Sequence, residues 1–195
     1  ARAAQVLFVG RLGREKGVMH LLEAWRRWGS DAPMLEVVGE GTESDAARRF
    51  VSEAGLESRV RLTGGLSFHD VQRRLAGSRL LVVPSLCFEG YPMVIREAFA
   101  LGVPVAASDL GSLADIVDES VGRRFRPGDP GNLLEVVRQL WSDADALAAM
   151  AGAARARYER DLAPAPNVQR LMAIYETARA IRAARADGRL NGERS

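Results

Sequence analysis

Short apolar runs alternate with amphipathic stretches along most of this 195-residue chain, and this alternation constrains the fold more than any other feature. Each apolar run is bounded by Gly, Pro, Ser or Thr, and a stretch with helical spacing follows it. This order is typical of a parallel sheet with right-handed helical connections. Because most of the runs are almost continuously apolar, we expect both faces of the sheet to be buried.

We therefore predict an α/β fold: a Rossmann-like, three-layer α/β/α arrangement with a parallel sheet of about six strands, followed by C-terminal helices. The predicted strands are 5–10, 34–39, 59–63, 80–84, 103–108 and 121–125, and the predicted helices between them are 17–28, 43–54, 68–76, 92–101 and 112–117. Three further helices are predicted over 131–141, 143–159 and 166–185. We expect one domain over residues 1–186 and a disordered tail over 187–195.

Composition narrows the classes of function. The formal net charge is only +2, which argues against a nucleic-acid-binding surface. The single cysteine permits no internal disulfide, so we expect a reducing compartment such as the cytoplasm. No apolar run reaches the roughly 18–20 residues that a membrane span needs.

Two acids bracket the predicted turn between the strand 80–84 and the helix 92–101. Glu89 lies in the loop, and Glu97 lies on the second turn of a helix that begins at Pro92. In open α/β sheets, ligands bind at the carboxyl ends of the strands. Carboxylates in this position accept hydrogen bonds from vicinal hydroxyls, so the pattern predicts a sugar or a ribose as the ligand.

Two cations follow the first predicted strand. Arg11 stands at its carboxyl end, and Lys16, the only lysine of the chain, lies where the next helix begins. An Arg and a Lys in the same crevice would hold a diphosphate. The first amides of the Pro92 helix, those of Met93 and Val94, would add further donors. The alternative is that both cations are simply solvated, but their combination with two acids favours a binding site.

Other chemistries find less support in the sequence. The turn Gly39–Ser44 resembles a dinucleotide fingerprint, but no acid ends the next strand at Thr63–Gly65, which disfavours a nicotinamide cofactor. We find no cluster with metal-ligand spacing and no Ser-His pair of a hydrolase. Asp109 and Ser112 flank Leu110-Gly111. Contact with the ligand is one alternative for them, but we expect them to cap the helix 112–117.

The ordered set of motifs resembles the C-terminal, donor-binding domain of a GT-B glycosyltransferase of the large retaining family four, the group 1 glycosyl transferases. It covers residues 6 to about 140. The motifs are Phe-Val-Gly-Arg-Leu…Glu-Lys-Gly (8–17), Val-Val-Gly-Glu-Gly (37–41), Val-Arg-Leu-Thr-Gly (60–64), Val-Pro-Ser (83–85), Glu-Gly-Tyr-Pro…Glu-Ala (89–98), Ala-Leu-Gly-Val-Pro-Val-Ala-Ala-Ser (100–108) and Gly111.

The resemblance implies a role for each matching residue. Arg11 and Lys16 match the basic pair that stabilises the departing diphosphate, and Glu89 matches the first acid of an E-x7-E motif, beside the donor sugar. The resemblance also implies retaining hexosyl transfer from a nucleotide-sugar donor without metal or cofactor. It gives donor-binding roles to Glu97, which would bind the ribose hydroxyls, and to Gly90, Tyr91, Pro92, Met93 and Val94. Pro92 stands where many members have Gly, which should stiffen the turn.

A GT-B enzyme has two Rossmann-like domains, so the resemblance also implies that the N-terminal acceptor domain is absent and that this fragment is inactive alone. Any peripheral membrane association would then come only through that missing domain. Two alternatives stay open: a non-catalytic nucleotide-binding or interaction module of the same fold, and half of a sugar-nucleotide epimerase.

Overall fold

The computed structural model describes residues 4–90 and 92–186. Its contacts divide the chain into two compact units, residues 1–156 and 157–195. The expected single domain over 1–186 stays a prediction, and the expected disordered tail, 187–195, lies outside the described residues.

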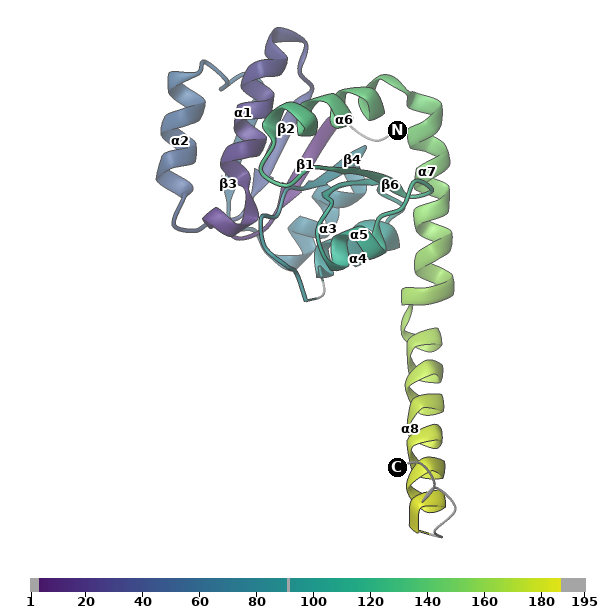
Figure 1. Cartoon of the computed structure of the whole chain (residues 1–195). Helices are drawn as coiled ribbons and strands as arrows, with labels where there is room; N and C mark the ends of the chain where they lie inside the picture. The colour runs from purple at the N-terminus through teal and green to yellow at the C-terminus, as the bar shows by residue number, and fades with distance from the viewer. Residues whose placement is uncertain (1–3, 91, 187–195) are drawn as a thin grey trace. The chain divides into compact units, whose positions relative to one another are not determined.

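The first unit contains one six-stranded parallel sheet with the order β3-β2-β1-β4-β5-β6, as Figure 1 shows. The sequence-based fold class is confirmed. Three strands, β3, β5 and β6, begin later than predicted. The strand β5 starts at Val105 because Pro104 has no N–H to give to the ladder. The strands are β1 (Gln5–Val9), β2 (Met34–Val38), β3 (Val60–Gly64), β4 (Leu80–Val83), β5 (Val105–Ser108) and β6 (Gly122–Phe125).

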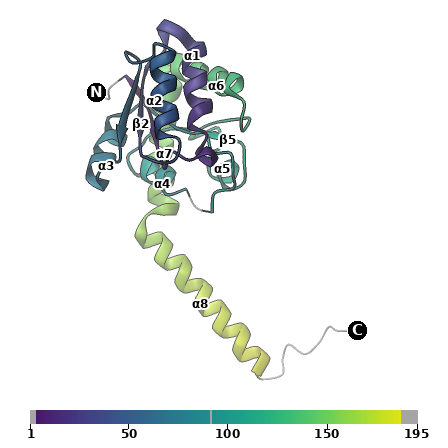
Figure 2. The ribbon, with the colours of Figure 1, turned by 90° about the vertical axis from the view of Figure 1, so that its left-hand side faces the viewer.

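Helices cover both faces of the sheet (Figures 1 and 2). On one face lie α1 (Val18–Trp28), α2 (Ser44–Glu53) and α6 (Pro130–Ser142). On the other lie α3 (Phe68–Gly77), α4 (Met93–Ala100) and α5 (Ser112–Ile116). Short 3₁₀ turns precede and follow α1: η1 (Arg14–Lys16) and η2 (Gly29–Asp31). The three layers follow from strands that are apolar on both faces.

A buried side chain anchors α1, and a side-chain cap marks the start of α6. Trp25 of α1 is fully buried, and its indole N–H donates to the carbonyl of Pro33 at 2.8 Å. The α6 helix begins with Pro130, and the carboxylate of Asp129 caps its Gly131 and Asn132 amides. These local signals fix the helix starts that the sheet then packs against.

The C-terminal helices differ in detail from the sequence-based expectation. A single helix was expected over 143–159, whereas α7 (Ala144–Arg157) is followed by a π-helical turn, η3 (Tyr158–Leu162). The helix α8 (Pro164–Ala186) then starts at a proline, which favours a helix beginning over continuation of the preceding one. Large apolar side chains of α8 are exposed, namely Val168, Leu171, Met172, Ile174, Tyr175 and Ile181.

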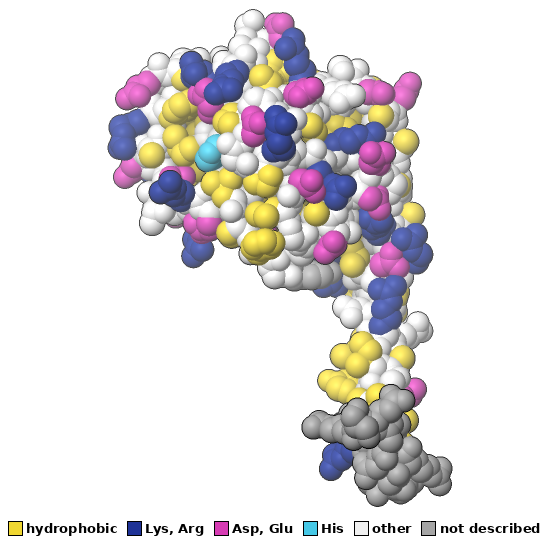
Figure 3. Space-filling view, viewed as in Figure 1, with side chains coloured by type: hydrophobic (Ala, Val, Ile, Leu, Met, Phe, Trp, Pro, Cys, Tyr) yellow, Lys and Arg dark blue, Asp and Glu magenta, His cyan; other side chains and the backbone are white. Residues whose placement is uncertain are grey.

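Two observations concern the sequence-based expectations about nucleic acid and about a membrane span. On the face shown in Figure 3, acidic and basic side chains are interspersed over the described residues, without a broad basic patch. Among the described residues, no helix combines the length and apolarity required to cross a bilayer.

Candidate functional site

A pocket of about 360 Å³ opens at the carboxyl ends of the adjacent strands β1 and β4. The chain proceeds outward from β1 to β2 and, in the opposite direction, from β4 to β5, so this is the point where the strand order reverses. Ligands of open α/β sheets bind at such switch points. The volume lies in the range of small-molecule sites. Its lining residues are Phe8, Val9, Gly10, Arg11, Lys16, Val83, Ser85, Glu89, Pro92, Met93, Val94 and Glu97.

Lys16 and Glu89 form the polar centre of this pocket, although 73 positions separate them in the sequence. The ammonium Nζ lies 2.5 Å from Glu89 Oε1, and Ser85 Oγ donates to the same oxygen at 2.7 Å. Both charged side chains are largely buried. Burial by itself would raise the pKa of Glu89, but the hydrogen bonds from Lys16 and Ser85, with the charge of Lys16, outweigh it and hold that pKa below its usual range. Glu89 is therefore an ionised carboxylate at neutral pH.

Hydrogen bonds to its backbone hold the loop that carries Glu89 from both sides. The Leu86 amide donates to the Glu15 carbonyl in η1 at 2.8 Å, and the Ser112 hydroxyl at the start of α5 donates to the Glu89 carbonyl at 2.6 Å. The loop is thus tied to the turn that carries Lys16 and to the helix that follows β5. These ties preorganise the Lys16–Glu89 pair.

Arg11 lines the pocket from the end of β1, but its guanidinium is mostly exposed. It donates to Glu15 Oε1 at 2.7 Å, an ion pair that the sequence analysis did not anticipate. The Glu15 backbone amide and then Arg11 lower the pKa of Glu15 from its usual value. Because the pair is exposed, it holds Arg11 only weakly, and the guanidinium is free to turn toward an anion in the pocket.

The first turn of α4 supplies the other wall. Pro92 is the residue before the helix, and Met93, Val94 and Glu97 face the pocket. The first amides of any helix lack partners within the helix and carry partial positive charge, which suits an anionic ligand. Partial burial raises the pKa of Glu97, opposed by the amide of Gln72 and the charge of Arg96. The two acids of the site thus have pKa values shifted in opposite directions.

The structure brings together seven of the nine residues assigned from the sequence: Arg11, Lys16, Glu89, Pro92, Met93, Val94 and Glu97. Gly90 is exposed and is not a lining residue, and Tyr91 lies outside the described residues. The glycine turn at 39–41 does not line the pocket either.

Some polar residues play parts that the sequence analysis missed. Asp109 and Ser112 do not cap α5, whose first residue follows Gly111 at a φ of 52°. Asp109 pairs instead with Arg124 at 3.4 Å, and Ser112 holds the Glu89 carbonyl. Ser85, to which the sequence analysis assigns no role of its own, donates to Glu89. Its place two positions after the last residue of β4, Val83, was the available signal.

Metal-ligating side chains do not gather in the part of the chain that the structure describes. No group of three or more His, Cys, Asp or Glu residues there has the arrangement to hold a metal ion. The polar inventory of the pocket is instead two cations, two carboxylates, a hydroxyl and a helix N-terminus. This set suits a ligand that carries both negative charge and hydroxyl groups.

The fold is that of one Rossmann-like half of a GT-B protein, and sequence comparison gives the family. The family model for glycosyl transferases group 1 matches residues 2–157, so the chain belongs to that family. It is 29% identical over 166 residues to an MMP α-(1→4)-mannosyltransferase of Mycolicibacterium hassiacum and 31% identical over 161 residues to a glycogen synthase of Mycobacterium tuberculosis. These matches cover 84% and 81% of this chain but only 40% and 39% of the relatives.

Solved structures show the same fold. The Anabaena protein Alr3699/HepE in complex with UDP superposes with a TM-score of 0.81 at 24% identity, covering 90% of this chain and 49% of that protein. A sucrose-phosphate synthase from Thermosynechococcus elongatus gives a TM-score of 0.78 at 25% identity, covering 91% of this chain and 46% of that protein. The chain therefore spans about half, or less, of the proteins that it resembles.

Proposed function

We propose that the pocket between β1, β4 and α4 binds a nucleoside-diphosphate sugar as the donor of a glycosyl transfer reaction. The observation that carries the proposal is the convergence of Lys16, Arg11, Glu89 and Glu97 on one pocket at the switch point of the sheet. Membership of the group 1 glycosyltransferases supports it. The UDP in the Anabaena structure makes UDP the first nucleotide to test.

Each group then has a defined part in the chemistry. The bond from the anomeric carbon to the diphosphate breaks, the diphosphate leaves with the electron pair, and the acceptor hydroxyl forms the new bond and loses its proton. Lys16, Arg11 and the first amides of α4 stabilise the charge that develops on the leaving diphosphate. Glu89 lies beside the donor sugar, and Glu97 accepts hydrogen bonds from the ribose hydroxyls. We propose retention at the anomeric carbon, as in family four.

We further propose that transfer needs no metal or other cofactor, because the cations and the helix N-terminus supply the positive charge. The check is donor turnover by a longer protein containing this chain, with EDTA and with added Mg²⁺ or Mn²⁺. Equal rates are expected, and dependence on the added ion would contradict this part. A cytoplasmic location, suggested by the single cysteine, is part of the same proposal.

We propose that this chain binds donor but does not transfer sugar alone, since the relatives are more than twice as long as the segment they share with it. The assay mixes the chain with donor sugars and candidate acceptors. Measurable transfer to an acceptor would contradict this part of the proposal.

The first experiment is calorimetric titration of the chain with UDP, GDP and ADP. Saturable binding of at least one of them is expected, and the diphosphate should bind more tightly than the matching nucleoside. Absence of binding to all three would overturn the proposal and favour an interaction module that merely keeps the fold.

Replacing Glu97 by Ala is expected to weaken nucleoside-diphosphate binding by roughly 10- to 100-fold, because it removes a charged acceptor of the ribose hydroxyls. The loss should be much smaller for the 2′-deoxy nucleotide, which already lacks one of those hydroxyls. A matched control is Glu53→Ala at the exposed end of α2, which should leave affinity unchanged. Unaltered affinity in the Glu97 variant would remove the ribose assignment.

A further inference from the structure

The carboxylate of Glu89 is held through only one of its two oxygens. Lys16 Nζ lies 2.5 Å from Oε1, and Ser85 Oγ donates to the same Oε1 at 2.7 Å. Within the described residues no donor reaches the second oxygen, Oε2, which is also not fully buried. Each carboxylate oxygen accepts about two hydrogen bonds, so the protein saturates Oε1 and leaves Oε2 open to a ligand in the pocket.

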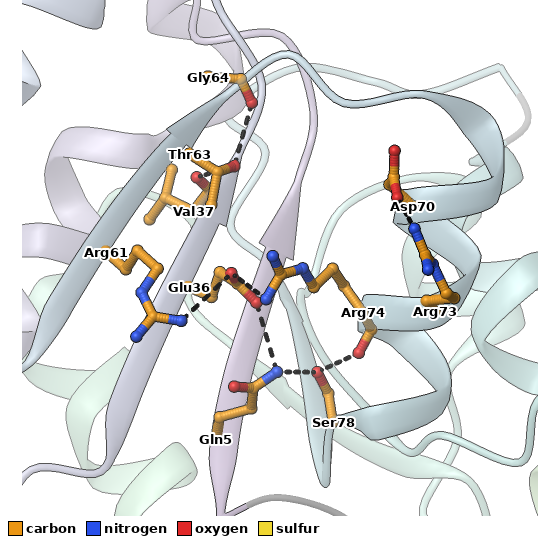
Figure 4. A network of polar contacts seen from close by, with 10 residues as sticks. All are labelled: Gln5, Glu36, Val37, Arg61, Thr63, Gly64, Asp70, Arg73, Arg74 and Ser78. Carbon is orange, nitrogen blue, oxygen red and sulfur yellow. Dashed lines mark hydrogen bonds and ion pairs between the residues drawn. The ribbon is translucent and has the colours of Figure 1, made fainter.

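A second carboxylate, that of Glu36, shows how the same fold binds an acid that is not in the pocket (Figure 4). Glu36 is fully buried in the middle of β2. Its Oε1 lies 3.0 Å from Arg74 Nη1, and its Oε2 accepts from Gln5 Nε2 at 3.3 Å. Both of its oxygens thus face nitrogen donors of the protein. The one-sided arrangement at Glu89 is therefore a property of the pocket and not of buried acids in this fold.

Two short segments that lie against each other place the two donors to Glu89. The amide of Leu86 donates to the carbonyl of Glu15 at 2.8 Å. The carbonyl oxygen of Pro84 is so near to Gly17 that it would lie 2.0 Å from a Cβ there. Between these two contacts, each segment contributes one donor to the carboxylate. The positions of both donors are thereby fixed by backbone contacts before a ligand arrives.

The two donors differ in what a bound diphosphate does to them. The ammonium of Lys16 has three N–H groups, and an anion in the pocket competes with Glu89 for them. The hydroxyl of Ser85 has a single proton, which is given to Glu89, and the residue is 1% exposed. A ligand therefore cannot draw this donor away easily. Ser85 is the contact that keeps Glu89 in place while Lys16 is shared with phosphate.

We propose that Ser85 is a positioning residue of the donor site, whose hydroxyl fixes Glu89 Oε1 so that Oε2 accepts a hydroxyl of the donor sugar. The inference rests on the proposed function. It predicts that Ser85 acts on the sugar part of the donor and not on the nucleotide part. Ordering of the Glu89 side chain then costs little when the sugar binds, and more of the contact energy appears as affinity.

The pKa of Glu89 is a measure of this contact. Burial raises that pKa, while the hydrogen bonds from Lys16 and Ser85 and the charge of Lys16 lower it. Without the hydroxyl, burial is less opposed, so the pKa of Glu89 rises. The charged groups around this carboxyl are Lys16 and Glu15 of η1, of which Glu15 acts to raise the pKa, and Arg11 and Glu97 of the pocket wall.

The test replaces Ser85 with Ala and measures the affinities for UDP and for UDP-glucose by calorimetry. Binding of UDP-glucose should weaken roughly 3- to 10-fold, because the loss is that of one hydrogen bond that orders the sugar's acceptor. Binding of UDP should change less than about twofold. If the parent chain binds GDP or ADP in place of UDP, the glucose derivative of that nucleotide is used.

Ser108→Ala is the matched control. Ser108 is the last residue of the neighbouring strand β5, is fully buried and does not line the pocket. Its hydroxyl oxygen has no hydrogen-bond partner in the part of the chain that the structure describes. The control removes the same hydroxyl at the same depth and should change neither affinity.

A second readout does not depend on ligand binding. Carbon-13 NMR titration of the Glu89 carboxyl, assigned with Glu89→Gln, should show a higher pKa in Ser85→Ala than in the parent chain and in Ser108→Ala. If Ser85→Ala does not fold, Ser85→Cys serves instead, because a thiol is a weak donor and should move the pKa in the same direction.

The outcomes separate the two proposals. A parent chain that binds none of the nucleotides contradicts the proposed function, while the NMR titration still decides whether Ser85 controls Glu89. A parent chain that binds nucleotide, with Ser85→Ala losing no affinity or losing it equally for both ligands, overturns the positioning role alone. Selective loss of UDP-glucose affinity with an unmoved Glu89 pKa also overturns it, since the hydroxyl would then act on the sugar by another route.

Discussion

Replacing Lys16 by Met is expected to weaken nucleoside-diphosphate binding by roughly 10- to 100-fold, because each charge-assisted hydrogen bond to a phosphate contributes about 1.5–3 kcal/mol. A second effect acts in the same direction. Lys16 is the partner of the largely buried Glu89, and without it the carboxylate faces the diphosphate as an unpaired negative charge. Methionine has nearly the same length as the lysine stem, so the packing changes little. Calorimetric titration with UDP, GDP and ADP measures the loss.

The matched control for this prediction lies two positions away. Arg14 belongs to the same 3₁₀ turn, is exposed and does not line the pocket. Arg14→Met removes the same unit of charge and should change the affinity less than about twofold at physiological salt, because exposed distant charges are screened. Equal losses in the two variants would show that Lys16 acts through net charge alone, contrary to a specific phosphate contact.

Most of the fold could be predicted from the sequence because the signals are local. Strands such as Leu80–Val83 are uninterrupted apolar runs ended by a proline, and the helices between them have regular apolar spacing and recognisable ends. A chain of this order has few ways to bury both faces of its sheet. The β2 strand is the exception, since Glu36 is fully buried in its middle. Only the three-dimensional structure shows the Arg74 and Gln5 side chains that make this burial possible.

The candidate site could be predicted at the level of its position and its charges. Parallel strands bring their carboxyl ends to one edge, so Arg11, Lys16, Glu89 and Glu97 were expected to converge, and they do. The pairing within the site was not predictable. Lys16 contacts Glu89 across 73 positions. This contact depends on how the sheet places η1 and the loop after β4, and no spacing rule within one element contains that information.

Asp109 and Ser112 show the same limit at shorter range. A polar residue next to a glycine before a helix is a typical capping pattern. Here the backbone of Gly111 has a left-handed φ of 52° and turns the chain so that neither side chain reaches the first amides of α5. Ser112 instead donates a hydrogen bond to the Glu89 carbonyl, and Asp109 forms an ion pair with Arg124.

Replacing Gly17 by Ala is expected to reduce stability by about 3 kcal/mol or more, which lowers the melting temperature of a chain of this size by roughly 6–12 °C. Gly17 has a φ of 69°, and a Cβ there would lie 2.0 Å from the carbonyl oxygen of Pro84. The Cβ is held rigidly by the backbone of residue 17 and the oxygen belongs to the backbone of Pro84, so neither can move aside cheaply. Relief requires that the start of α1 and the end of β4 separate, and these segments carry Lys16 and Ser85. Nucleotide affinity should therefore fall together with stability.

Gly55→Ala separates the two causes of this loss, which are backbone strain at a positive φ and steric overlap with Pro84. Gly55 has almost the same φ, 65°, but a Cβ at that position meets nothing within 4 Å. It should cost only the strain of a left-handed alanine, about 1–2 kcal/mol, and leave nucleotide binding intact. Thermal unfolding of both variants and of the parent chain, followed by circular dichroism, gives the comparison. Equal melting temperatures for the two variants would mean that backbone strain alone accounts for both losses, and that the close approach of Gly17 to Pro84 does not hold the Lys16 turn against the end of β4.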